Sequence, residues 1–135
     1  MEASVPGEET MATILLVDDE PLQASFRKSA LERYFDDVQR VPDAAEALCM
    51  VEQPGFARKL GLVIAGHHAP GFGGPAFVHE LHDRLPALNV VVIGNNGELP
   101  TDYRDNKVYF LPNQAEVDEL AAISGFLLEQ RNRAA

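Results

Sequence analysis

Short apolar runs recur along the chain and are separated by longer stretches of mixed polarity. Three of the runs, residues 14–17, 60–65 and 90–93, consist of aliphatic residues and glycine alone. A strand that packs on both of its faces has this continuous pattern, whereas a half-buried strand alternates apolar and polar positions. A fourth apolar run at residues 108–111 and a more polar piece at residues 37–41 bring the predicted strands to five.

Apolar residues at helical spacing fill the intervals between these strands. The first helix is predicted to open at Pro21, because the first turn of a helix tolerates proline, and to end near Phe35. The second follows a capping residue, Asp43, and is stopped by Pro54 and Gly55. The apolar face of the first helix is formed by Leu22, Phe26, Ala30, Leu31 and Tyr34.

Two further helices are predicted in the second half of the chain. One starts at Pro75 and is closed by Pro86, and the other spans residues 116–131. Residues 95–107 are polar and interrupted by glycine and proline, so any helix in this stretch is predicted to be short or irregular. The buried stripe of the last helix is formed by Val117, Leu120, Ile123, Leu127 and Leu128.

Strands that alternate with helices predict an α/β fold with a doubly wound parallel sheet covered on both faces. In such sheets ligands bind at the carboxyl ends of the strands, so we expect any site at that edge. At 135 residues the chain fits one domain. We place this domain at residues 12–131, after a disordered acidic tail at residues 1–11 and before a tail or linker at residues 132–135.

Composition and charge narrow the classes of function. With 46% hydrophobic and 24% charged residues the chain is typical of a soluble globular domain, and its net charge of -10 disfavours direct contact with nucleic acid. A single cysteine, Cys49, excludes a disulfide framework and a CxxC metal site. No apolar run approaches the roughly 20 residues of a membrane helix, and the first residues lack the order of a signal peptide. We therefore expect a cytoplasmic protein that contacts neither DNA nor a membrane.

Two stretches carry a specific resemblance to a known family. ILLVDDEP at residues 14–21, with its acidic pair directly after the first strand, and LVIAGHHAPGFGGPAFVHEL at residues 62–81 are similar to the response-regulator receiver domains of bacterial two-component systems. The resemblance covers roughly residues 12–130. It implies the flavodoxin-like (βα)5 fold with strand order 2-1-3-4-5, here with a short or irregular fourth helix.

The resemblance also implies a phosphoryl-transfer site with defined parts. In this family an aspartate at the end of the third strand accepts the phosphoryl group, an acidic pair helps to hold Mg²⁺, and a hydroxyl residue and a lysine contact the phosphoryl oxygens. Asp18 and Asp19 match the acidic pair. The acceptor position falls on Gly66, the hydroxyl position on Gly94 and the lysine position on Asn113.

The loss of three parts of one site predicts that this chain forms no acyl phosphate. Residues 60–78 contain no Asp or Glu, so shifting the alignment restores no acceptor. Phe110 falls at the position of the family's switch aromatic, whose inward turn follows the hydroxyl residue that is missing here. A switching role for Phe110 and a role as an ordinary buried strand aromatic are equally open.

Acidic residues and histidines offer weaker metal sites. Asp18 and Asp19 are candidates for Mg²⁺, but two adjacent carboxylates lack the third anionic ligand that favours such a cation. We favour the interpretation that Asp18 ends the first strand and that Asp19 or Glu20 caps the first helix. His67 and His68 could join the acidic pair around a transition metal, although adjacent residues of an extended segment point apart. The other two histidines, His79 and His82, are expected to form a solvated helix face.

The sequence therefore predicts a phosphorylation-independent receiver domain, without enzymatic activity or a resident cofactor, that serves as an interaction or dimerisation module. Its partner is expected to be another protein or a second copy, and a C-terminal output domain is expected if the chain is part of a longer protein. Two other functions stay open. One is a small-molecule sensor whose ligand enters the space at Gly66 and Gly94, and the other is a metal-binding domain that uses Asp18 and Asp19.

Overall fold

One parallel sheet organises the part of the chain that the computed structural model describes, residues 12–66, 73–94, 103, 107–112 and 115–134. The strand order is β2-β1-β3-β4-β5, and every neighbouring pair is parallel. The flavodoxin-like order expected from the resemblance is therefore confirmed. The strands are β1 (Thr13–Val17), β2 (Asp37–Val41), β3 (Leu60–Gly66), β4 (Asn89–Gly94) and β5 (Val108–Pro112).

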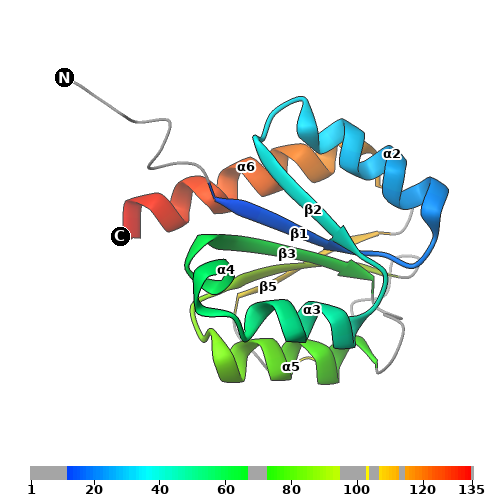
Figure 1. The fold of residues 1–135 in the computed structure, drawn as a ribbon. Coiled ribbons are helices and arrows are strands. Elements are labelled where there is room, and N and C mark those ends of the chain that lie inside the picture. The colour runs from blue at the N-terminus through cyan, green and yellow to red at the C-terminus, as the bar shows by residue number, and fades with distance from the viewer. Residues whose placement is uncertain (1–11, 67–72, 95–102, 104–106, 113–114, 135) are drawn as a thin grey trace.

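Helices cover both faces of the sheet, as Figure 1 shows. Helices α2 and α6 lie on one face and α3 and α5 on the other, while the short α4 leads from α3 into the start of β3. This arrangement follows from right-handed crossovers between parallel strands. The helices are α2 (Pro21–Glu32), α3 (Ala44–Val51), α4 (Pro54–Lys59), α5 (Gly74–Arg84) and α6 (Val117–Ala134).

Alternate side chains of the central strands fill two separate apolar cores. Leu15 and Val63 point into the core under α3 and α5, while Ile14 and Leu62 point into the core under α2 and α6. Because both faces are covered, neither set of positions can be polar, which explains the continuous apolar runs in the sequence. The side chain of Phe77, on α5, is fully buried and is the largest in the first core.

The buried face of helix α2 is not the one that the sequence predicted. Ala24, Ala30 and Leu31 are buried, but Leu22 is 81% exposed and Phe26 is 65% exposed. The small side chain of Ala24 sets the side of the helix that lies against the sheet, and this turns the larger residues outward. Tyr34 is exposed as well, so the prediction of burial is wrong for three of the five residues.

The predicted stop at Pro54 and Gly55 is only half right. Helix α3 does end before them, at Val51, but Pro54 opens the further helix α4. A proline in the first turn leaves no intrahelical hydrogen bond unmade, so the same residue that ends one helix can begin the next. The tail predicted at residues 1–11 and almost all of the stretch 95–107 lie outside the described residues.

Gly61, the second residue of β3, lies where two elements approach the strand most closely. A Cβ atom at Gly61 would lie 2.7 Å from Cβ of Ala12 and 2.7 Å from Cδ2 of Leu128. By contrast, a Cβ atom at Gly55 in α4 would meet nothing within 4 Å. The two glycines thus form a matched pair that separates the effect of packing from that of glycine itself.

We predict that Gly61→Ala lowers the free energy of unfolding by about 1–3 kcal/mol, because the added methyl group overpacks the contact between β3 and α6. Gly55→Ala should leave it unchanged or raise it by up to ~1 kcal/mol, since alanine favours a helix over glycine. Urea denaturation followed by circular dichroism measures both. Equal midpoints for Gly61→Ala and the unmodified protein would show that this packing is looser than described.

Candidate functional site

Three residues that the sequence singles out lie together at the carboxyl edge of the sheet, the edge formed by the ends of β1, β3 and β4. Val17 pairs with Ala65, so that Asp18 follows β1 at the level of Gly66 on β3. Gly66 pairs with Ile93, and Gly94 is the next residue of β4. Asp18, Gly66 and Gly94 therefore occupy adjacent strand ends, where a doubly wound sheet usually holds its ligand.

The carboxylate of Asp18 is buried and already has partners for both of its oxygens. Its Oδ2 lies 3.2 Å from Nη1 of Arg27, and its Oδ1 accepts a hydrogen bond from the backbone N–H of Glu20 at 3.0 Å. Only 7% of the Asp18 side chain is exposed. Since a buried charge needs a partner, the Arg27 guanidinium serves as the counter-charge of this carboxylate.

A second arginine lies at the same strand end. Arg40, on β2, donates from Nε to the backbone oxygen of Asp18 at 2.9 Å. Two guanidinium groups, from Arg27 and Arg40, therefore lie close to Asp18, one at its carboxylate and one at its backbone oxygen. Their positive charges oppose the approach of a cation.

The second and third acidic residues have separate environments. Asp19 is exposed, and Glu20 is the N-cap of α2, where its side chain accepts a hydrogen bond from the backbone N–H of Gln23 at 2.7 Å. This satisfies one of the backbone donors that every helix start leaves free. The interpretation that Asp19 or Glu20 caps this helix is confirmed, and the capping residue is Glu20.

Mg²⁺, which the resemblance to receivers implies, does not fit the described residues of this edge. Both oxygens of Asp18 are engaged, and Gly66 has no side chain to offer as a ligand. Among the described residues, no group of three His, Cys, Asp or Glu side chains lies close enough to hold a metal ion. Asn113, His67 and His68 lie outside the described residues.

Phe110 packs against another aromatic ring. Its ring is half-buried on β5 and meets Tyr103 edge to face, with 5.2 Å between the ring centroids. Both rings border the core under α3 and α5. The contact is of the kind that stabilises aromatic pairs.

The prediction that His79 and His82 form a solvated helix face is confirmed for His79 and wrong for His82. His79 is exposed, but His82 is half-buried and its Nε2 lies 2.7 Å from the backbone oxygen of Leu88. Because a carbonyl oxygen only accepts, Nε2 must carry the proton and donate. His82 thereby fixes the turn between α5 and β4, which is a structural role that spacing alone did not reveal.

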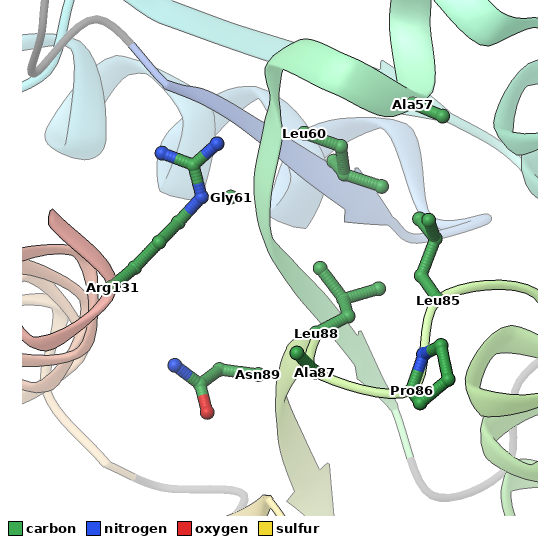
Figure 2. Close-up of a pocket in the computed structure, with 9 residues that line it drawn as sticks. All are labelled: Ala57, Leu60, Gly61, Leu85, Pro86, Ala87, Leu88, Asn89 and Arg131. Atoms are coloured by element: carbon green, nitrogen blue, oxygen red, sulfur yellow. The ribbon is translucent and has the colours of Figure 1, made fainter. Parts of the chain in front are cut away.

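Two cavities lie away from the carboxyl edge, and neither was found from the sequence. The first, the amino-edge pocket, has a volume of about 240 Å³ and lies at the opposite edge of the sheet (Figure 2). Its nine lining residues are Ala57, Leu60, Gly61, Leu85, Pro86, Ala87, Leu88, Asn89 and Arg131. A polar residue, Asn89, directly before a buried apolar run is the sequence signal that could have pointed to it.

The second cavity, the α2–α6 groove, has a volume of about 650 Å³. Its lining residues are Tyr34, Phe35, Asp118, Ala121, Ala122, Gly125, Phe126 and Glu129. Tyr34, which follows α2, and Phe126, on α6, are exposed. Leu22 and Phe26, which lie within α2, are exposed as well. These four are the large exposed hydrophobic residues of the described part of the chain, and all of them belong to the α2–α6 side.

Comparison at the level of sequence finds no relative: no protein-family model matches the chain, and neither does any curated protein. None of the helices in the described ranges is long and apolar enough to cross a membrane.

Comparison with solved structures gives many matches, and the three described below are receiver domains. A response-regulator receiver domain from Clostridium thermocellum has a TM-score of 0.78 at 18% identity and covers 92% of this chain and 99% of its own. The receiver domain of the hybrid histidine kinase CckA has a TM-score of 0.71 at 27% identity and covers 87% and 99%.

A third matched domain belongs to a longer protein. The N-terminal domain of a response regulator/sensory box/GGDEF three-domain protein from Carboxydothermus hydrogenoformans has a TM-score of 0.77 at 19% identity and covers 90% of this chain and 98% of its own. Such low identities establish the fold and leave the chemistry to the residues themselves. The chain therefore has the fold of a response-regulator receiver domain.

Proposed function

We propose that this chain is a receiver-type signalling module of a two-component system that works without phosphorylation and acts by binding a protein partner. Phosphorylation independence is inferred from the side chains at the carboxyl edge of the sheet. Asp18 is held by Arg27 and by a backbone N–H, next to a strand that ends in Gly66. This arrangement supports the proposal because the end of β3 offers no acceptor side chain and the carboxylate of Asp18 is already paired.

The residues that stand in place of the usual receiver residues each lack a different group needed for phosphoryl transfer. At Gly66 the chain lacks the carboxylate that would form an acyl phosphate at the end of β3. The positive charge that Mg²⁺ would supply is instead supplied permanently by Arg27. We infer that Asp18, Asp19, Gly66, Gly94 and Asn113 form a degenerate phosphoacceptor pocket whose charge is fixed rather than switched.

The α2–α6 groove supports the second part of the proposal. Exposed large apolar side chains that gather on one side of a protein mark an interaction surface more often than isolated ones do. Gly125 adds a second argument, since glycine in the middle of a helix costs stability. A Cβ atom there would lie 3.7 Å from Cζ of Phe35, an ordinary contact distance, so packing within this chain does not require the glycine.

The charge of the groove selects its occupant. Acidic side chains, Asp118 and Glu129, accompany the apolar lining, and the whole chain carries a net charge of -10. Two copies that met through this groove would bring like charges together across a symmetric interface. We therefore infer that the occupant is an amphipathic helix of another protein, with an apolar stripe flanked by Lys or Arg. Dimerisation is the competing outcome of the test below.

A further domain fits this role. The matched domain from Carboxydothermus hydrogenoformans is the first of three in its own protein. We propose that this chain likewise works next to an output domain, to which partner binding at the α2–α6 groove would be transmitted. In this role the chain is a signalling module rather than a catalytic enzyme.

We predict that acetyl phosphate with Mg²⁺ leaves the mass of the intact protein unchanged. Gly66→Asp alone should also acquire little phosphoryl group, because Arg27 still occupies the carboxylate that a metal would need. The double variant Gly66→Asp with Arg27→Met frees Asp18 and should label more than the single variant. Intact-mass spectrometry at neutral pH measures all three proteins. Efficient labelling of the unmodified chain would end the proposal of phosphorylation independence.

We predict that a labelled helical peptide with a leucine stripe flanked by lysines binds the chain, and that the same peptide with glutamates in place of lysines does not. Gly125→Leu fills the groove and should weaken binding by about tenfold or more, since a complementary apolar contact of this size is worth 1–2 kcal/mol. Ala45→Leu, at an exposed position of α3, is the matched control and should bind as before. Fluorescence anisotropy measures the affinities.

Sedimentation of the chain alone decides between the two occupants. We expect a monomer whose mass does not change with concentration. A dimer that Gly125→Leu disrupts and Ala45→Leu does not would show that the groove receives a second copy, against the charge argument.

A further inference from the structure

We propose that the amino-edge pocket is a docking site for an acidic segment of another protein. The segment inserts one large apolar side chain into the cavity and carries Asp or Glu on either side of it. The pocket shares no lining residue with the α2–α6 groove, which favours a basic helix. The chain thus has two docking sites of opposite charge preference, and either of them can be lost without the other.

The segments that form the pocket are basic, although the chain as a whole is acidic. The lining residues and their direct neighbours in sequence span residues 56–62, 84–90 and 130–132, which contain no Asp or Glu. The whole chain contains 21 Asp or Glu residues against 11 Lys or Arg. A local reversal of charge on an acidic protein attracts acidic partners and repels basic ones. The basic residues of the three segments are Arg58, Lys59, Arg84 and Arg131.

Two of these cations are available to a partner. Arg58 and Lys59 are exposed at the end of α4, between two residues that line the pocket. Within the part of the chain that the structure describes, neither of them forms an ion pair. The other two cations are engaged, because Arg84 is held between two glutamates and Nη2 of Arg131 donates to the backbone oxygen of Arg58 at 3.4 Å.

A third exposed cation borders the pocket from the direction of β5. Lys107 directly precedes this strand, and its backbone oxygen accepts a hydrogen bond from the backbone N–H of Val90 at 3.0 Å. Val90 follows the lining residue Asn89, at the start of β4. Since β4 lies between β3 and β5, Lys107 and the basic end of α4 stand on opposite sides of the pocket. An anchor residue with an acidic neighbour on each side would therefore meet a cation at both ends.

Apolar side chains line most of the cavity. Figure 2 shows Leu60, Leu85 and Leu88 gathered on one side of it, with Arg131 apart from them. The volume of about 240 Å³ lies below the usual range of about 300–1,000 Å³ for drug-sized ligands. The cavity therefore fits one large side chain, such as that of phenylalanine or leucine. A single anchor that fills a pocket carries much of the affinity at many protein interfaces.

Contacts within the chain fix the walls of the pocket before a partner arrives. The ring of His82 donates from Nε2 to the backbone oxygen of Leu88 at 2.7 Å, which holds the turn between α5 and β4. The contact of Arg131 with the backbone of Arg58 joins α6 to α4 on the other side. A site that is already ordered loses less conformational entropy when it binds, so a short partner segment is sufficient.

Nucleic acid is a poorer occupant than an acidic protein segment. A long polyanion would extend beyond the few exposed cations onto the surface of a chain whose net charge is -10. Single-stranded nucleic acid also gains affinity by stacking its bases on aromatic rings, and none of the nine lining residues is aromatic.

Nuclear magnetic resonance of the ¹⁵N-labelled chain, with synthetic peptides as probes, tests the docking site. The acidic probe is the peptide GDEDFLDEDG. The matched probes are GDEDAADEDG, which lacks the anchor, and GKKKFLKKKG, which has inverted charge. We expect the acidic probe to cause saturable shifts of the backbone amides of Ala57 and Leu88 with a Kd of about 1 mM or tighter. The matched probes should bind this site about tenfold more weakly or not at all.

Two pairs of variants connect the shifts to the pocket. Ala87→Glu places a negative charge in the lining and should weaken binding of the acidic probe about tenfold or more, and Lys59→Glu should weaken it about threefold. Both positions are exposed, so neither change disturbs the core. Ala45→Glu on α3 and Lys28→Glu on α2 make the same changes of charge elsewhere and should bind as before.

Three results would overturn the docking site. The first is the absence of saturable shifts at Ala57 and Leu88 with the acidic probe. The second is binding that Ala87→Glu and Lys59→Glu leave unchanged, which would place the peptide elsewhere on the protein. The third is an oligothymidylate of about ten nucleotides that shifts the same amides at a lower concentration than the acidic peptide does, which would make nucleic acid the occupant.

Two occupants from the chain itself are decided by further measurements. Residues 1–11 contain three glutamates, so the acidic probe is also titrated into the chain that lacks these residues. Binding that occurs only after this deletion would make residues 1–11 the occupant. A mass in sedimentation that rises with concentration, and that Ala87→Glu returns to the monomer value, would make a second copy the occupant. Either result would overturn the assignment to another protein.

Discussion

The ion pair between Asp18 and Arg27 is the constraint on which the chemistry of the carboxyl edge depends. A buried carboxylate at the end of β1 must be neutralised by some cation, and Nη1 of Arg27 stands 3.2 Å from it. A side chain is a permanent partner, whereas a metal ion can come and go. Gly66 lies beside it at the end of β3 and has no side chain that could serve as an acceptor. The fold is that of a receiver, and we propose that the charge balance at this edge is fixed rather than switched.

On the proposed function, in which the carboxyl edge is not switched by phosphorylation, the domain has to receive information at another place. The described surface offers two such places, and both differ from the carboxyl edge in character. The α2–α6 groove is broad, apolar and accompanied by acidic side chains, which favours a basic helix. The amino-edge pocket is small, and most of its lining residues are apolar. Partner binding at the α2–α6 groove would need no chemistry at Gly66.

The fold could be predicted from the sequence because it depends on a pattern, whereas the partners of single side chains depend on details that a pattern lacks. Continuous apolar runs identified the buried strands, and the cap at Asp43 marked the start of α3 correctly. Helical spacing could not show that Ala24 would face the sheet and that Leu22 and Phe26 would not. The pairing of Asp18 with Arg27 joins a residue just after β1 to a residue on α2, nine positions later, so neither strand nor helix periodicity reveals it. The unpaired oxygen of Asn89 is likewise a property of packing.

Titration of the unmodified protein with Mg²⁺ tests the central claim most directly. The backbone amides of Asp18, Asp19 and Gly66 report on the carboxyl edge in a ¹⁵N correlation spectrum recorded at neutral pH and low salt. The account predicts no saturable shift of these resonances at millimolar Mg²⁺, because Arg27 already neutralises the buried carboxylate. Saturable shifts centred on Asp18 would contradict it, since they would mean that a metal displaces the guanidinium and that the edge still works as a cation site.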